Sequence, residues 1–125
     1  MQIELAYGKG RLKASIPDNV NTSVVEPRYV KGLPDQLSAV KEALADPINH
    51  LPLSESVRQG HKVAVIFSDI TRATPYHIML RPLLQALSHI PDDQITFFCA
   101  TGTHRPATPE ELITILGREV TTRFR

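Results

Sequence analysis

Two apolar segments of strand length, separated by an amphipathic stretch, restrict the fold of this chain more than any other feature of its sequence. Residues 62–68 and 94–100 are nearly continuous runs of apolar residues, which is typical of strands buried on both faces. Between them, a helix is expected to begin at Pro75 with Thr74 as its N-cap. Its apolar stripe consists of Ile78, Met79, Leu83, Leu84 and Leu87. A strand, a helix and a strand in this order predict parallel strands joined by a right-handed crossover.

The segments before this unit predict a hairpin and a helix. Residues 2–5 and 11–16 alternate partly between apolar and polar side chains on either side of the turn-forming residues 7–10, which favours a β-hairpin. A polar surface connection is expected over residues 17–31. Apolar residues then recur at helical spacing over 34–45, with Pro34 in the first turn of the expected helix.

Two more helical segments complete the expected secondary structure: a short turn over 53–57 and a helix that begins at Pro109. Thr108 and Glu111 have the spacing of a capping box, and Gly117 is expected to end the helix. The predicted fold class is therefore α/β, with an N-terminal hairpin followed by βαβα units and a parallel sheet. Since only two strands of that sheet are present, either the hairpin and an unseen strand complete it, or residues 1–125 are a partial amino-terminal domain of a larger two-domain protein.

Composition and charge exclude several classes of protein. The 125 residues are 42% hydrophobic and 22% charged, and their net charge of +1 supplies no basic field for nucleic acid or anionic lipid. No apolar run approaches the roughly 20 residues that a membrane span needs. The single cysteine, Cys99, cannot form an internal disulfide, and no secretory signal is visible, so a cytoplasmic location is expected. Glycine-rich nucleotide-binding motifs, a Gly-x-Ser-x-Gly motif and histidine or cysteine pairs at metal-ligand spacing do not occur, so no metal site is predicted in this segment.

Polar loops follow both predicted parallel strands, over residues 69–74 and 101–106. The carboxyl ends of neighbouring parallel strands lie at the same edge of a sheet, where open α/β sheets bind their ligands. Arg72 and Arg105 can each present a planar fork to a carboxylate or phosphate, with amides at the start of the helix as further donors. His104 can exchange a proton near neutral pH, and Asp69 can orient a partner or pair with an arginine.

Each of these residues also has a purely structural interpretation. Asp69 and Thr71 are common turn-forming residues, Gly102 can simply permit a left-handed backbone, and the two arginines can form surface ion pairs. Cys99 is interpreted as a small buried apolar residue. The remaining histidines are expected to be exposed or hydrogen-bonded rather than catalytic: His50, His61, His77 and His89.

The two loop sequences together resemble the amino-terminal domain of the nickel-dependent lactate racemases. The first signature is Asp69-Ile70-Thr71-Arg72-Ala73-Thr74-Pro75, and the second, about thirty positions later, is Ala100-Thr101-Gly102-Thr103-His104-Arg105-Pro106. The resemblance extends over essentially the whole chain. It includes the segments Tyr7-Gly8-Lys9-Gly10, Ile16-Pro17-Asp18, Ala45-Asp46-Pro47-Ile48, Thr108-Pro109-Glu110-Glu111-Leu112 and Leu116-Gly117.

This resemblance implies a racemase or epimerase of small 2-hydroxy acids that uses a nickel-pincer nucleotide, Ni pyridinium-3,5-bisthiocarboxylate mononucleotide. In that family a histidine takes the proton of the substrate hydroxyl while the α-hydrogen moves to the cofactor as hydride, and return from the other face inverts the centre. By residue, the resemblance implies that Asp69, Ile70, Thr71 and Arg72 contact the cofactor. It also implies that Arg72 clamps the substrate carboxylate and that His104 is one of two acid/base histidines.

The same resemblance implies that part of the site lies outside this chain. The family's cofactor-tethering lysine, its nickel-ligating histidine and its second acid/base histidine all occur further along, so the remainder of the enzyme or a partner chain is expected to supply them. Neither nucleic acid nor a membrane is an expected partner. Two alternatives remain open at this point: a noncatalytic domain that holds a small anion or nucleotide phosphate between Arg72, Arg105 and helix amides, and a structural remnant that needs a partner to cover its sheet.

Overall fold

The computed structural model describes residues 1–124, which form two compact units, Met1–Gly32 and a second that begins at Leu33. The first unit contains the expected hairpin. Strand β1 (Gln2–Tyr7) pairs antiparallel with β2 (Gly10–Ser15), and Tyr7 lies opposite Gly10. Gly8 begins the turn with a φ of 56°, the left-handed conformation that two-residue hairpin loops require. Strands β1 and β2 form a two-stranded sheet of their own.

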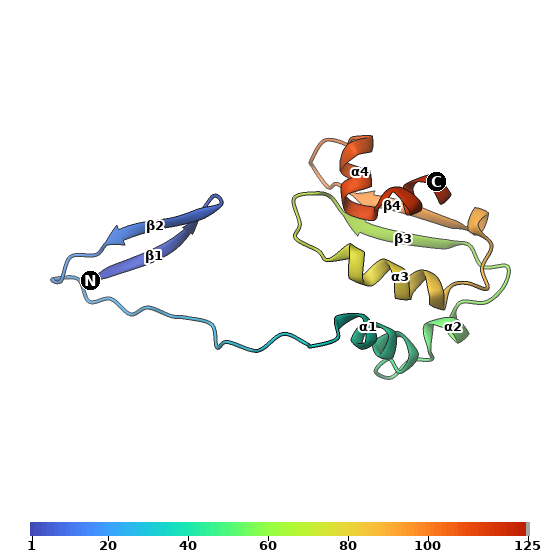
Figure 1. Ribbon diagram of the computed structural model, residues 1–125, viewed down its shortest axis with the longest axis horizontal. Helices are drawn as coiled ribbons and strands as arrows, with labels where there is room; N and C mark the ends of the chain where they lie inside the picture. Colours follow the sequence, from blue (N-terminus) through green and yellow to red (C-terminus); the bar gives the residue numbers. More distant parts are fainter. Residues whose placement is uncertain (125) are drawn as a thin grey trace. The chain divides into compact units, whose positions relative to one another are not determined.

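The second unit contains the predicted parallel pair. Strands β3 (Val63–Ser68) and β4 (Ile95–Ala100) are hydrogen-bonded in parallel, with Phe67 opposite Cys99 and Ser68 opposite Ala100 (Figure 1). Helix α3 (Tyr76–Ala86) connects them and runs without interruption through Pro82. A 3-10 turn, η1 (Asp92–Gln94), which the sequence analysis did not anticipate, leads into β4. The α/β fold class is thus confirmed.

The remaining helices follow the expected order with small shifts. Helix α1 (Gln36–Ala45) begins after Asp35, whose carboxylate accepts a hydrogen bond of 3.0 Å from the Ser38 amide. The expected start at Pro34 was therefore wrong, because Asp35 is the better N-cap. Helix α2 (Leu53–Ser56) and helix α4 (Pro109–Leu116) lie where they were predicted, and α4 has the complete capping box of Thr108 and Glu111.

Gly117 separates two helices rather than ending the structured chain. Its φ of 85° closes α4, and a further helix, α5 (Arg118–Arg123), begins directly after it. Val120 and Phe124 lie four residues apart and are both buried, so this segment contributes one apolar side to the core. The four-residue spacing of Val120 and Phe124 is the feature of the sequence from which α5 could have been predicted.

The core lies on one face of the β3–β4 sheet, where α3, α4 and α5 pack. Three aromatic rings run across it: Phe97 lies 6.4 Å from Phe67 and 5.3 Å from Phe124, measured between ring centroids. The buried residues of the core are Phe67, Leu80, Leu87, Ile90, Ile95, Leu116, Val120 and Phe124. No helix among residues 1–124 is both long and apolar enough to cross a membrane.

Within the described part of the second unit, the two strands are buried on one face only, whereas the sequence predicted burial on both faces. Along each strand, alternate residues point away from the core, and Ile66 is 71% exposed and Phe98 53% exposed. These two side chains lie directly opposite each other in the register. The continuous run of apolar residues therefore arises because the exposed face of the strand pair is also apolar. Sequence periodicity alone does not distinguish such an exposed apolar face from a buried one.

This one-sided burial predicts very different costs for truncating two phenylalanines on neighbouring strands. Phe67→Ala removes a ring that is 4% exposed and is expected to lower the free energy of unfolding by about 3–5 kcal/mol. Phe98→Ala removes a half-exposed ring and is expected to cost about 1 kcal/mol or less. Urea unfolding followed by far-ultraviolet circular dichroism measures both, and equal losses would contradict the assignment of the faces.

Candidate functional site

The loop after β3 is organised by the carboxylate of Asp69. Its Oδ1 accepts hydrogen bonds from the Thr71 amide at 3.2 Å and the Thr71 hydroxyl at 2.6 Å, and the Arg72 amide donates to the Asp69 carbonyl at 3.2 Å. These contacts form a tight turn directly after the strand. Asp69 and Thr71 therefore do form a turn, as their structural interpretation held. This role uses only one of the two carboxylate oxygens of Asp69.

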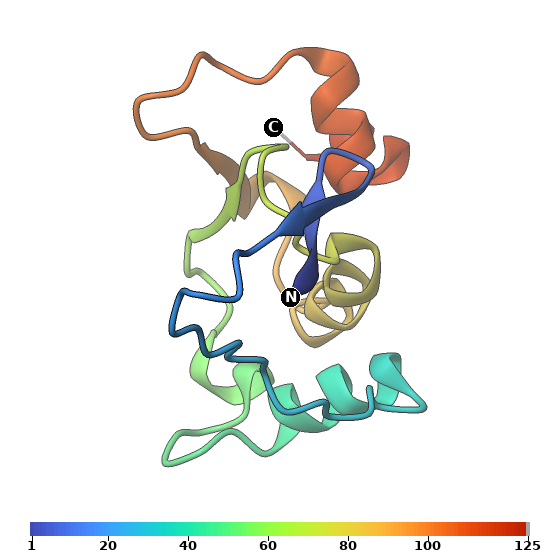
Figure 2. The ribbon, with the colours of Figure 1, turned by 90° about the vertical axis from the view of Figure 1, so that its left-hand side faces the viewer.

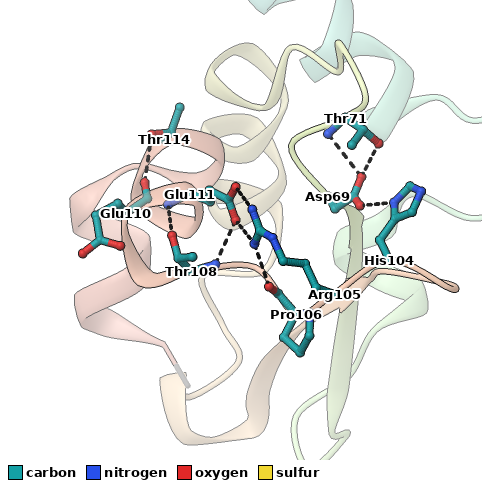
Figure 3. A network of polar contacts seen from close by, with 9 residues as sticks. All are labelled: Asp69, Thr71, His104, Arg105, Pro106, Thr108, Glu110, Glu111 and Thr114. Carbon is teal, nitrogen blue, oxygen red and sulfur yellow. Dashed lines mark hydrogen bonds and ion pairs between the residues drawn. The ribbon is translucent and has the colours of Figure 1, made fainter.

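The second oxygen of Asp69 contacts the loop after β4. Oδ2 lies 2.5 Å from Nδ1 of His104, which is 35 residues further along the chain (Figure 3). Asp69 is 7% exposed, whereas the His104 side chain is half exposed. The hydrogen bonds from the Thr71 hydroxyl and from His104 lower the pKa of Asp69 from 3.8 to about 2, so this group is a carboxylate at neutral pH. The structure thus brings together two of the predicted site residues, Asp69 and His104.

The charge of Asp69 determines which nitrogen of His104 carries a proton. An ionised carboxylate accepts hydrogen bonds only, so Nδ1 of His104 must donate. In the neutral imidazole, Nε2 is then left as an acceptor. Because the His104 side chain is half exposed, this geometry can present a proton acceptor at the carboxyl edge of the sheet.

Arg72 and Arg105 differ in what surrounds them. Arg72 is exposed, and among residues 1–124 no hydrogen bond or ion pair holds its guanidinium. Arg105 instead forms a two-pronged ion pair with Glu111, with Nη1 to Oε2 at 2.9 Å and Nη2 to Oε1 at 2.7 Å. The structure therefore assigns Arg105 a partner within the fold in place of the anion expected from its sequence. Glu111 was interpreted only as a capping residue, and no short-range spacing rule indicates its pairing with Arg105.

The helix after the first loop also differs from expectation. Thr74 is not the N-cap of α3, because the helix begins at Tyr76 and is preceded by Pro75. The Tyr76 hydroxyl reaches back to β3, where it accepts a 2.7 Å hydrogen bond from the Ser68 amide and lies 2.7 Å from the Ser68 hydroxyl. The Tyr76 amide donates to the Thr74 carbonyl at 2.9 Å, so it is not available as an anion donor. These contacts tie both ends of the loop together.

The remaining candidate residues, Ile70, Gly102 and Cys99, have no surroundings that indicate a catalytic role. Ile70 is exposed, and Gly102 has a φ of 59°, as the structural interpretation required. Burial, followed by the charge of Asp69, raises the pKa of the half-buried Cys99 thiol, which disfavours a reactive thiolate. Among residues 1–124, no group of three or more His, Cys, Asp or Glu side chains is arranged to hold a metal ion.

Comparisons with known proteins identify similar domains. A family model described as the lactate racemase N-terminal domain matches residues 7–125. The lactate racemase of Lactiplantibacillus plantarum is 37% identical over 122 residues, and that of Thermoanaerobacterium thermosaccharolyticum is 28% identical over 122 residues. Each alignment covers 94% of this chain and 28% of the relative, so the chain spans about a quarter of the length of the curated relatives that it matches.

A solved structure agrees with the fold. The lactate racemase apoprotein from Thermoanaerobacterium thermosaccharolyticum superimposes with a TM-score of 0.75 at 25% identity. The alignment covers 100% of this chain and 29% of that chain. The matched region thus includes both loops that carry Asp69 and His104.

The low pKa of Asp69 predicts a pH-dependent effect of its replacement. A carboxyl group whose pKa falls from 3.8 to about 2 on folding stabilises the fold above its unfolded pKa and loses this contribution as the pH falls through about 2. Asp69→Asn is therefore expected to lower the urea midpoint at pH 7 and to differ progressively less from the parent protein between pH 4 and pH 2. Asp93→Asn, at an exposed carboxylate, is the control. A loss for Asp69→Asn that is constant across this pH range would contradict the assignment.

Proposed function

Because this chain belongs to the lactate racemase N-terminal domain family, we propose that it supplies part of the active site of a racemase or epimerase of small 2-hydroxy acids such as lactate. The observation that carries the proposal is the contact between Asp69 and His104, which joins the two loops at the carboxyl edge of the parallel sheet. That contact provides an oriented proton acceptor. The family assignment supports this reaction class, and the geometry supports His104 as one acid/base residue for it.

We propose the nickel-pincer nucleotide as the cofactor, held in part by residues 69–72. The exposed Arg72 fits an anionic nucleotide, since its guanidinium can pair with a phosphate or carboxylate. The two oxygens of Asp69 are already engaged by Thr71 and His104, so the exposed residues of this segment, Ile70, Thr71 and Arg72, are the ones that could contact the cofactor. The nickel ligand and the covalent tether would come from residues outside residues 1–124. When bound, this group would supply the hydride-transfer chemistry at the α-carbon of the substrate.

The residues of this chain would then perform two tasks. Arg72 binds the substrate carboxylate and thereby orients the hydroxyl group, as a bidentate guanidinium can. His104 accepts the hydroxyl proton at Nε2, while the Asp69 carboxylate holds Nδ1–H and fixes the tautomer. A matching acid/base histidine on the other face of the substrate would be needed for inversion, and it would lie outside residues 1–124.

We further propose that residues 1–125 are a partial amino-terminal domain. Two observations support this proposal. The chain spans 28% of the length of its curated relatives, and the β3–β4 pair leaves Ile66 and Phe98 open on one face. Parallel sheets are ordinarily covered on both faces. The remainder of the enzyme is the cover that the family assignment favours.

The noncatalytic alternative, an anion-binding domain, is weakened by the same contacts. It requires Arg72, Arg105 and the helix amides together, but the Arg105 fork is occupied by Glu111 and the Tyr76 amide by a carbonyl group. Of the groups that this alternative requires, the Arg72 guanidinium remains to bind the anion. A role for His104 in turnover is what separates the two functions.

Removing the imidazole of His104 tests the proposed function. In the protein at its natural length, His104→Ala is expected to lower kcat for the interconversion of D- and L-lactate about 10²–10⁴-fold, the usual contribution of a general acid/base. Cofactor binding is expected to persist, because His104 is assigned to proton transfer. His50→Ala is the matched control, since this exposed ring lies outside both site loops and its Nδ1 is 2.9 Å from the carbonyl oxygen of the adjacent Leu51. Unchanged turnover in His104→Ala would leave the site with a binding role alone.

The isolated 125-residue chain, supplied with loaded cofactor, is expected not to interconvert D- and L-lactate. Residues 1–124 contain one candidate acid/base histidine in the site and no arranged metal ligands, so the reaction lacks essential groups. Polarimetry or a stereospecific lactate assay measures the conversion. Robust activity of this chain alone would refute the proposal that the site is incomplete.

A further inference from the structure

The loop that carries His104 is held by very few contacts. It joins β4 to α4 and arches away from the end of the strand before the helix begins (Figure 2). Most residues from Gly102 to Thr108 are exposed, so apolar packing does not fix the position of the imidazole. Within the loop, the His104 amide donates to the Thr101 carbonyl at 3.0 Å, which shapes the turn but does not attach it to the rest of the fold.

Two side-chain contacts attach the middle of this loop to the fold, and they leave the loop on opposite sides. His104 points toward Asp69, while the adjacent Arg105 points toward Glu111 (Figure 3). One contact reaches the loop after β3, and the other reaches the first turn of α4. A change at either attachment therefore moves the same short piece of backbone.

The Arg105–Glu111 contact, which we call the loop clamp, has a specific geometry. Its two parallel N–H···O bonds of 2.9 and 2.7 Å fix the guanidinium in one plane. Arg105 Nη1 also donates to the Pro106 carbonyl at 3.0 Å, and Oε2 of Glu111 also accepts from the Thr108 amide at 2.9 Å. The clamp thus connects the residue next to His104 with the N-cap of α4. A lysine cannot reproduce it, because an ammonium group is a point charge without the fork.

We propose that Arg105 is a positioning residue, whose clamp on Glu111 holds His104 in contact with Asp69 and in place for proton transfer. This inference rests on the proposed function and deepens it. Arg105 acts on the backbone of its neighbour and does not touch the substrate. A displacement of the imidazole by about 1 Å is enough to lower turnover by about 10²-fold.

The chain offers variants that separate positioning from general stability. Arg105→Lys keeps the charge and removes the fork. Glu111→Gln removes the ion pair but keeps the capping box, which accepts glutamine at this position. The matched control is Arg123→Lys, because Arg123 forms a second two-pronged pair, with Asp92, through bonds of 2.7 and 2.7 Å between α5 and η1. That pair lies outside both site loops.

In the protein at its natural length, Arg105→Lys and Glu111→Gln are each expected to lower kcat about 10–100-fold with KM changed less than about threefold. Arg123→Lys is expected to leave both constants unchanged. The double variant is expected to be no worse than either single variant, and Arg105→Lys is expected to have no further effect in a His104→Ala background, because the residues act as one unit. A rise in KM with unchanged kcat would indicate direct substrate binding and overturn the proposal, as would an unchanged kcat.

Imidazole nitrogen resonances of the 15N-labelled chain provide a readout that does not depend on activity. The parent chain is expected to show His104 with protonated Nδ1 in a hydrogen bond, and this signature is expected to weaken in Arg105→Lys and Glu111→Gln but not in Arg123→Lys. The same signature in the parent chain and in all three variants would overturn the proposal that the loop clamp positions His104. If the natural-length protein does not interconvert lactate at all, the proposed function fails, while the resonances still decide whether the clamp positions His104.

Discussion

The parallel register of β3 and β4 is the constraint on which the site depends. Because Ser68 lies opposite Ala100, the two loops leave the sheet at the same level, and Asp69 and Thr101 start side by side. A slip of one residue would turn every side chain of one strand to the other face and remove Phe67 from the core. The row of aromatic rings formed by Phe67, Phe97 and Phe124 therefore fixes the register and, through it, brings His104 within hydrogen-bond distance of Asp69.

Asp69 shows that one residue can both stabilise its own turn and orient a side chain of another loop. Burying a carboxylate to this extent costs free energy of folding unless its oxygen atoms accept hydrogen bonds. Here one oxygen closes its own turn on Thr71, and the other orients the imidazole of a different loop. The turn holds the carboxylate still, and a carboxylate held still can fix the tautomer of His104. The stabilising role is thus a condition for the positioning role.

Local sequence patterns predicted most of the fold. The features that were not predicted depend on contacts between residues far apart in the sequence. The Thr108–Glu111 capping box, the Gly8 turn and the strand–helix–strand order are determined within short segments, so the sequence was sufficient for them. Three features depend on what packs nearby: the open face with Ile66 and Phe98, helix α5 beyond Gly117, and the pairing of Arg105 with Glu111. An apolar residue looks the same in sequence whether or not something covers it. The position of the candidate site was predicted from the strand ends, whereas the pairing of Arg105 with Glu111 was not.

The way the His104 loop is held fits the proton-transfer role proposed for His104. An acid/base side chain must remain accessible, and half of the His104 side chain is exposed. Packing the loop into the core would fix the imidazole but bury it, because apolar contacts exclude the substrate along with water. Directional polar contacts avoid this conflict: the Asp69 bond and the Arg105–Glu111 pair restrain orientation through a few atoms and leave the ring open. A loop of this kind depends on each contact individually, so under the proposed role of His104 a conservative change such as lysine for arginine is expected to lower turnover more than stability.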